Sequence, residues 1–258
     1  MESQDKISER IYRAGLIIIG NEILSGRTLD KNTQHIGVAL NEVGVVLSEV
    51  RIVPDIEARI IDAVQHFSKT YDYVFTTGGI GPTHDDITSE TIAKAFGVAW
   101  EMNEQAREIL LAHYGEAELT EARLRMAMIP AGASLIPNPV SSAPGFKIEN
   151  VHVMAGVPRI MQGMLDHILP TLAGGVAVQS VTVSIDIAES KLSDELGALQ
   201  DAFPDLDIGS YPNFRNGKLG VSAVMRGRDE SMLAAAEAQL IEVLGAYKVD
   251  FIDGDLEL

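Results

Sequence analysis

A short apolar run near the start of the chain constrains the fold most. Residues 14–19 carry no charge and are followed by Gly20, which is the pattern of a strand buried on both faces of a parallel sheet. Further strands are expected at residues 45–53 and 73–77, and apolar residues at helical spacing occupy both intervals. Strand and helix therefore alternate, which predicts a doubly wound parallel sheet in an α/β protein.

The segments between these strands carry their own signals. Residues 20–31 are expected to form a loop, and the next helix is expected to begin at Asn32, with Asn32 or Thr33 as its cap. A second helix is expected from Asp55, with an inward stripe at Ile56, Ile60, Ile61, Val64 and Phe67. Residues 103–128 are interpreted as a further helix.

The pattern changes near Gly174-Gly175, which is interpreted as a hinge. We therefore divide the chain into an arm at residues 1–11, an α/β domain at 12–172 and a small α+β domain at 173–258. The last domain is expected to hold a strand at 178–187, a hairpin joined through Asn216-Gly217, and two helices.

Composition excludes several classes of protein. The net charge is −17, so a phosphate backbone would be repelled and nucleic acid is not an expected partner. The chain has no cysteine, which excludes disulfides, thiolate metal sites and cysteine nucleophiles. No apolar run approaches the ~20 residues that cross a bilayer, and residues 1–10 lack the apolar core of a signal peptide. A soluble, cytoplasmic protein with no membrane partner is expected.

Two loops stand where a parallel sheet binds ligands, at the carboxyl ends of its strands. The first loop offers small and amide residues as candidate ligand contacts, namely Gly20, Asn21, Ser25, Gly26 and Asn32, with the carboxylates of Glu22 and Asp30. The second offers hydroxyls and glycines, namely Thr76, Thr77, Gly78, Gly79 and Gly81, followed by Asp85 and Asp86.

These residue types suit a phosphate and a cation. Glycines permit positive φ, so that successive N–H groups face one concave cradle for phosphate oxygens. A divalent cation, Mg²⁺, Mn²⁺ or Co²⁺, prefers carboxylate oxygens, which Asp85, Asp86, Glu22 and Asp30 could supply. The spacing of a P-loop and the Rossmann fingerprint are both missing, so Walker-type kinases and NAD dehydrogenases are excluded.

Structural interpretations of the same residues remain open. A glycine-rich turn after a buried strand is often only a tight connection, and Asp86 could be a helix cap rather than a ligand. His84 and Glu22 could be solvated loop residues, and Asn32 could be a cap.

The loop sequences resemble those of the molybdopterin-binding (MoaB/Mog-like) domain family. The resemblance rests on residues 20–26 with Asp30 and Asn32, on 77–83 with Asp85 and Asp86, and on the later landmarks Asn138-Pro139, 143–146 and 156–158. It covers roughly residues 12–172 and is closest to the amino-terminal region of the competence/damage-inducible CinA proteins. The resemblance implies a three-layer, doubly wound, mostly parallel α/β fold with a phosphate bound in the Thr-Gly-Gly loop. It also implies that Asp85 and Asp86 are catalytic residues that serve metal binding and phosphoryl chemistry, with Asn138 as a further ligand-site residue.

The resemblance also frames the functional hypotheses. CinA-type versions are associated with metal-dependent hydrolysis of ADP-ribose, whereas a non-catalytic module for a molybdopterin-type ligand or nucleotide is the alternative. Ile80 stands where molybdenum-cofactor enzymes usually have threonine, which favours the nucleotide. Full CinA proteins continue into a deamidase domain that is not expected within these 258 residues. Relatives commonly assemble, so a homo-oligomer is expected, and an oligomeric scaffold is the third hypothesis.

Overall fold

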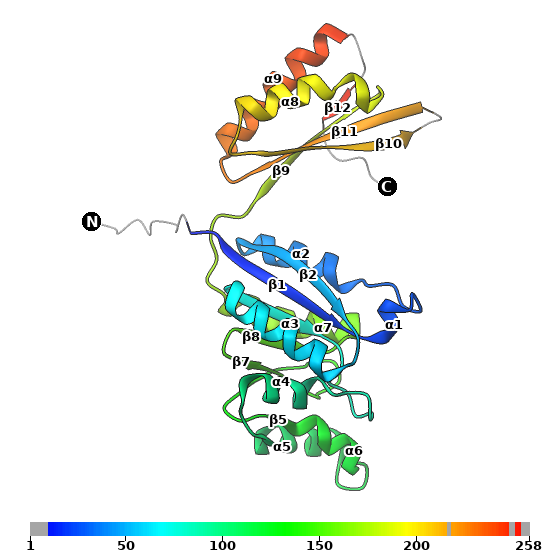
Figure 1. Ribbon diagram of the computed structural model, residues 1–258, viewed down its shortest axis with the longest axis vertical. Helices are drawn as coiled ribbons and strands as arrows, with labels where there is room; N and C mark the ends of the chain where they lie inside the picture. The colour runs from blue at the N-terminus through cyan, green and yellow to red at the C-terminus, as the bar shows by residue number, and fades with distance from the viewer. Residues whose placement is uncertain (1–9, 216–217, 248–250, 254–258) are drawn as a thin grey trace, which may run out of the picture. The chain divides into compact units, whose positions relative to one another are not determined.

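The chain forms two compact units, which divide between Val176 and Ala177. The computed structural model in Figure 1 describes residues 10–215, 218–247 and 251–253. Each unit has its own sheet and its own buried core. The two units are therefore described one after the other.

The first unit is built on a six-stranded sheet with the order β2-β1-β3-β8-β7-β6. Its first four strands in that order are parallel. At one edge, β7 pairs antiparallel with β8, and β6 pairs antiparallel with β7. In chain order the strands are β1 (Tyr12–Ile19), β2 (Val45–Val53), β3 (Tyr73–Thr77), β6 (Ser134–Ile136), β7 (Gly145–Ile148) and β8 (Val151–Met154). The predicted mostly parallel sheet is confirmed.

Helices cover both faces of this sheet and complete three layers. One face packs against α2 (Asn32–Glu42) and α7 (Pro158–Ile168), and the other packs against α3 (Glu57–Thr70) and α4 (Thr88–Phe96). The strand β1 serves both layers, because Leu16 and Ile18 join the first cluster while Ile17 and Ile19 join the second. The uninterrupted apolar run in the sequence is the direct consequence of this double burial.

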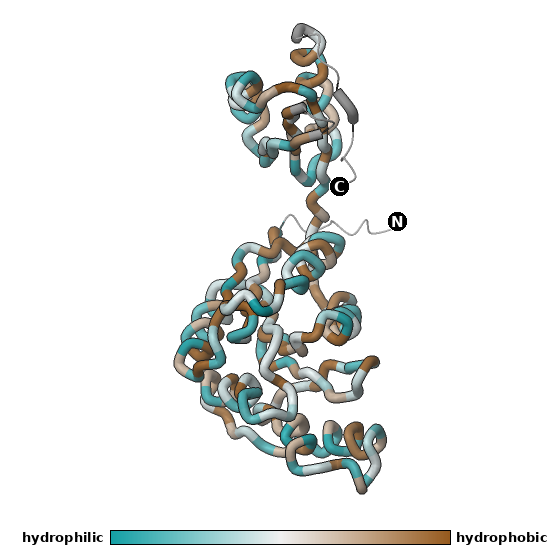
Figure 2. Tube along the Cα trace, turned by 90° about the vertical axis from the view of Figure 1, so that its right-hand side faces the viewer, coloured by the Kyte–Doolittle hydropathy of each residue, from teal (hydrophilic) through white to brown (hydrophobic). Residues whose placement is uncertain are grey.

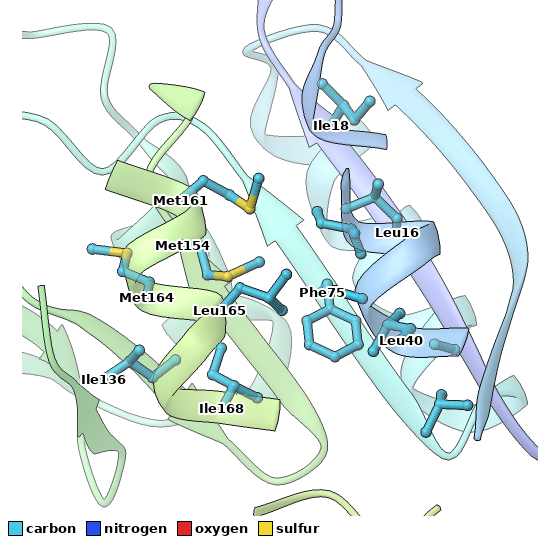
Figure 3. Close-up of a cluster of buried hydrophobic side chains, with 14 residues drawn as sticks. Leu16, Ile18, Leu40, Phe75, Ile136, Met154, Met161, Met164, Leu165 and Ile168 are labelled. Atoms are coloured by element: carbon cyan, nitrogen blue, oxygen red, sulfur yellow. The ribbon is translucent and has the colours of Figure 1, made fainter. Parts of the chain in front are cut away.

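Figure 3 shows the first of these clusters. Side chains of α7, including Met161 and Leu165, point toward Phe75 of β3, and Leu40 of α2 approaches it from the other side. Phe75 and Leu40 are fully buried. This packing fixes α2 and α7 against the strands whose carboxyl ends carry the candidate site.

A smaller layer follows α4 in the chain. It contains β4 (Trp100–Met102) paired with β5 (Met128–Pro130), together with α5 (Glu104–Tyr114), α6 (Glu121–Leu124) and the 3-10 turn η1 (Arg125–Ala127). The helix predicted over 103–128 is confirmed in α5, α6 and η1, but it is not continuous. Gly115 breaks it with φ +74°, a conformation that favours glycine, and Thr120 caps the next turn by accepting a hydrogen bond from the N–H of Arg123.

Three local expectations in the first unit are also corrected. Residues 21–24 form a short helix, α1 (Asn21–Leu24), within the segment expected to be a loop. The N-terminus of α2 is capped by Asp30, whose carboxylate accepts hydrogen bonds from the N–H groups of Asn32 and Thr33. Ile56 lies before α3 and is exposed rather than part of its inward stripe.

The second unit is an antiparallel sheet with helices on one side. The strand order is β10-β11-β9-β12, and the chain runs through β9 (Gln179–Ile185), the 3-10 turn η3 (Glu189–Lys191), α8 (Ser193–Ala202), β10 (Asp207–Arg215), β11 (Lys218–Gly227), α9 (Glu230–Tyr247) and β12 (Phe251–Asp253). Val183 and Ile185 face α8 and α9 in one cluster. The small α+β domain is thus confirmed, while the predicted turn Asn216-Gly217 lies outside the described residues.

Residues 173–175 belong to the first unit and are fixed there. The phenol of Tyr73 donates to the carbonyl oxygen of Ala173 and accepts from its N–H, at 3.0 and 2.8 Å. The N–H of Gly175 donates to the carbonyl oxygen of Gly44, and a Cβ on Gly174 would lie 1.7 Å from the carbonyl oxygen of Val43. The Gly174-Gly175 pair therefore serves a close backbone approach, and the chain leaves the unit only after it.

The longer helices of both units bury apolar residues in the cores. Along the trace, hydrophilic and hydrophobic residues alternate through the helical segments (Figure 2). Within residues 10–215, 218–247 and 251–253, no helix is both long enough and apolar enough to span a membrane. The apolar residues of the helices instead supply the buried clusters of the two units.

Candidate functional site

A broad pocket opens beyond the carboxyl ends of β1, β3 and β8. It has about 1600 Å³ of empty space, part of which is open solvent. Of the predicted site residues, the pocket is lined by Gly20, Glu22, Gly78, Gly79, Gly81, Asp85, Asp86 and Asn138. Both predicted loops therefore contribute to one hollow, which we call the phosphate pocket.

The glycine turn after β3 requires its glycines. Gly78 has φ +102°, and a Cβ there would lie 2.1 Å from the carbonyl oxygen of Ile19. Gly79 has φ +67°, and a Cβ there would lie 2.1 Å from Oγ1 of Thr88. The Thr88 hydroxyl donates to the carbonyl oxygen of Gly78, and its N–H donates to that of Gly79. The first turn of α4 thus holds the glycine turn in place.

The backbone N–H groups of this turn divide into two kinds. That of Gly78 donates to the carbonyl oxygen of Met154 and so extends the pairing of β3 with β8. Among the residues that the structure describes, nothing accepts a hydrogen bond from the N–H groups of Gly79, Ile80 or Gly81. All three residues line the phosphate pocket, so the predicted cradle is reduced to these three donors.

Asp85 and Asp86 share one hydroxyl group. Oγ1 of Thr83 lies 2.5 Å from a carboxylate oxygen of each, and the N–H of Thr83 donates to Asp86 at 2.8 Å. The hydroxyl has one proton, so it donates to one carboxylate at a time. The hydrogen bond from Thr83 lowers the pKa of Asp85, helped by the backbone and opposed weakly by burial. Asp85, whose side chain is 68% exposed, is therefore ionised at neutral pH.

Within the first loop, only part of the predicted set faces the pocket. Ser25 donates to the carbonyl oxygen of Glu22, and Gly26 adopts φ +72° in the turn that follows α1. The N–H of Asn21 donates to Asp55, a pocket residue that the sequence did not single out. Asn21, Ser25 and Gly26 shape the loop that carries Glu22.

Asn32 does not line the pocket but bonds to a residue that does. It is 6% exposed, and its Nδ2 donates to the carbonyl oxygen of Gly156 at 2.9 Å. Gly156 lines the pocket and packs against Gly78, because a Cβ on Gly156 would lie 3.2 Å from the Cα of Gly78. Asn32 is therefore a positioning residue, since it ties the start of α2 to the loop after β8.

Three other predicted residues are buried. Thr76 and Thr77 are buried in β3 at 0% and 1% exposure and do not line the pocket. Asn138 lines the pocket, but its side-chain oxygen accepts from the N–H groups of Val140 and Ser141 and its amide donates to Ser141 and Ala143. Its hydrogen-bonding capacity is filled, so Asn138 shapes its own loop.

The four predicted cation ligands do not form one cluster. Asp30 caps α2 and lies outside the pocket lining, whereas Glu22, Asp85 and Asp86 line it. In the described part of the chain, no group of three or more histidine or acidic residues converges as a protein-only metal site would require. The adjacent carboxylates of Asp85 and Asp86 do suit a magnesium-like ion, because such ions are usually held by one or two carboxylates with substrate phosphates and water.

The structure adds an arginine that sequence reasoning missed. Arg123 lines the pocket, lies over the ring of Tyr114 at 4.3 Å, and donates to the backbone and carboxylate of Glu118. It is therefore the basic side chain of the pocket wall, where it would favour an anionic ligand. The available signal was local: in an acid-rich chain, Arg123 and Arg125 stand two residues apart after the capping residue Thr120.

Comparison with known proteins finds a separate family match for each unit. Residues 15–174 match the family described as a probable molybdopterin binding domain, and residues 177–252 match the middle domain of FAD synthase. A solved structure titled as the protein CinA with unknown function, from Thermoplasma acidophilum, is 36% identical. It has a TM-score of 0.59 and covers 62% of this chain and 98% of that chain.

Longer similarities run through both units. A protein from Archaeoglobus fulgidus is 35% identical across 89% of this chain and 96% of its own length. A CinA-like protein from Citrifermentans bemidjiense is 36% identical across 91% of this chain but only 59% of its own length, and a Caldivirga maquilingensis protein, 41% identical, is matched over 65% of its length. The first unit contains the matched fold and loops, so the chain belongs to the molybdopterin-binding (MoaB/Mog-like) domain family in its CinA-like form.

Proposed function

We propose that the protein hydrolyses the pyrophosphate bond of a nucleotide sugar of the ADP-ribose type, with the help of a divalent cation. One observation carries the proposal. An ionised, exposed carboxylate, Asp85, lines the same pocket as the three unpartnered N–H groups of residues 79–81. Donors for a phosphate and a ligand for its cation thus occur side by side.

The N–H groups of Gly79, Ile80 and Gly81 would hold one phosphate group of the substrate. Backbone donors fixed before the reaction stabilise charge that develops on phosphate oxygens, because they need no reorganisation. The positive φ of Gly79 and the contact of its turn with Thr88 keep these groups in position. Their role is binding and orientation.

Asp85 and Asp86 would hold the cation, and Thr83 would position both carboxylates through its hydroxyl group. When bound, the cation would neutralise phosphate charge and lower the pKa of a bound water. The overall reaction adds the oxygen of water to one phosphorus and breaks its bond to the bridging oxygen. The products from ADP-ribose are AMP and ribose 5-phosphate.

A specific observation favours a second candidate, a binding module without turnover. The two adjacent carboxylates, Asp85 and Asp86, lie on one short loop. Asp30, which was also predicted to bind the cation, caps α2 instead, so the predicted set of cation ligands is incomplete. A nucleotide or a molybdopterin-type phosphate could be held by the same N–H groups without reaction. The family description, molybdopterin binding, names this class of ligand.

Product analysis separates the two candidates. The purified protein is incubated with ADP-ribose, FAD or NAD and with Mg²⁺, Mn²⁺ or Co²⁺, and the products are separated by chromatography. Metal-dependent AMP formation from ADP-ribose supports hydrolysis. Binding of ADP-ribose by calorimetry, with no product under any metal, would reject hydrolysis and favour the binding module.

A further inference from the structure

Two smaller hollows continue the phosphate pocket toward β4. The first shares Ile80, Gly81 and Asp86 with the phosphate pocket, and it is also lined by Trp100 and Arg125. The second again contains Trp100 and Arg125, and its other lining residues include the apolar Met102 and Leu124 and the acidic Glu90 and Glu121. The glycine turn and Trp100 thus line adjoining hollows, and we call the two smaller hollows together the tryptophan groove.

Trp100 presents a fixed aromatic face to this groove. Its indole Nε1 lies 2.9 Å from the carbonyl oxygen of Met128 and 3.1 Å from Oγ of Ser89, and Ser89 itself donates to the Met128 carbonyl. The polar edge of the ring is therefore held within the protein, while the side chain remains only half-buried. A rigid, partly exposed indole offers a stacking surface for a flat heterocycle.

Arg125 stands at the junction of the two hollows without a protein partner. Its side chain is half-buried in η1, yet it makes no hydrogen bond or ion pair with any described residue. Burying part of a guanidinium without an anion is unfavourable. Arg123, two residues earlier, differs because its guanidinium donates to the Glu118 carboxylate and lies over the ring of Tyr114. An unpaired arginine in a chain of net charge −17 points to an anionic partner from outside.

We propose that the tryptophan groove binds the nucleoside end of the substrate, an inference that rests on the proposed function. The base stacks on Trp100, and Arg125 donates to the phosphate attached to that nucleoside. The remaining phosphate lies in the cradle of residues 79–81. The groove thereby makes the protein selective for a phosphate that carries a flat ring over one that carries only a sugar.

The chain offers a direct probe, because Trp100 is its only tryptophan. Intrinsic fluorescence is measured while AMP or ribose 5-phosphate is added to the 258-residue protein. AMP is expected to quench the emission, since stacking brings the base onto the indole, and ribose 5-phosphate is expected to leave it unchanged. AMP that binds by calorimetry without altering the emission, or does not bind at all, would overturn the proposal.

Variants identify the two contacts. Trp100→Leu and Arg125→Ala are each expected to weaken AMP binding by about tenfold or more, while Trp100→Phe retains most of the affinity. Arg107→Ala removes an exposed arginine that pairs with Glu104 on α5 and serves as the matched control. Circular dichroism checks folding. Equal affinity of Arg125→Ala and Arg107→Ala for AMP would overturn the assignment of Arg125.

These outcomes are separate from the test of hydrolysis. AMP binding with quenching, but without metal-dependent product, would retain the groove and reject the enzyme. Hydrolysis of ADP-ribose with no quenching and no effect of Arg125→Ala would retain the enzyme and reject the groove.

Discussion

His152 lies in the middle of β8 and should make the stability of the first unit depend on pH. His152 is 1% exposed and stacks on Phe75 at 5.1 Å, and its Nε2 has no hydrogen-bond partner among the residues that the structure describes. Burial lowers the pKa of His152 to about 4, and the charge of Lys147 on the neighbouring strand acts in the same direction. The folded protein therefore keeps this imidazole neutral at pH values where the unfolded chain protonates it.

The sign and size of the effect follow from linkage. The folded pKa of His152 lies below the unfolded value of about 6.5. The contribution of the neutral imidazole to the free energy of unfolding is therefore fully present above pH 6.5, and it is lost as pH falls toward 4. The whole difference corresponds to about 3 kcal/mol, of which about 2 kcal/mol is lost between pH 7 and pH 5. His152→Phe removes the titrating group while keeping an aromatic ring beside Phe75.

The assay is urea denaturation of the wild-type protein and of His152→Phe at pH 7 and at pH 5. The free energy of unfolding of the wild type should fall relative to that of the variant by about 2 kcal/mol over this interval. His167→Gln, at an exposed position on α7, is the control and should follow the wild type. A difference between wild type and His152→Phe that is the same at both pH values would refute the reasoning.

Two further substitutions test the loops of the phosphate pocket. Asp30→Ala removes the carboxylate that caps α2 through the N–H groups of Asn32 and Thr33, and should lower the free energy of unfolding by about 1 kcal/mol, as measured by thermal denaturation; an unchanged midpoint would contradict the capping role. Gly79→Ala should abolish phosphate-ligand binding in calorimetry, because the added Cβ meets Oγ1 of Thr88 at 2.1 Å and φ is +67°; wild-type affinity would show that the turn tolerates another geometry.

The sheet of the first unit was predictable from the sequence because burial leaves a local signal. Residues 14–19 are buried on both faces of the sheet, so they form one apolar run, and the stripe of Ile60, Val64 and Phe67 reflects the single buried face of α3. α1 escaped prediction because it has four residues and none of them is buried. Without an apolar stripe, a single helical turn resembles a loop.

The position of the candidate site was predictable, but the role of each side chain was not. The rule for carboxyl ends of parallel strands led to both loops that line the pocket. A short polar residue next to the start of a helix can cap the helix, bind a ligand or connect two loops. Only the structure shows that Asp30 caps α2, whereas Asn32 donates a hydrogen bond to the carbonyl oxygen of Gly156. Trp100 and Arg125 come together in the tryptophan groove through tertiary packing, which a single sequence does not encode locally.

The central claim is that Asp85 takes part in hydrolysis at the phosphate pocket. The most direct test compares initial rates of AMP formation from ADP-ribose, with saturating Mg²⁺, for the wild type, Asp85→Asn and Asp62→Asn. Asp62 lies on α3 with a side chain 78% exposed and outside the pocket lining, so it is a matched loss of one charge. The account predicts that Asp85→Asn lowers the rate by about 100-fold or more while remaining folded, and that Asp62→Asn keeps the wild-type rate. Equal rates for the two variants would contradict it.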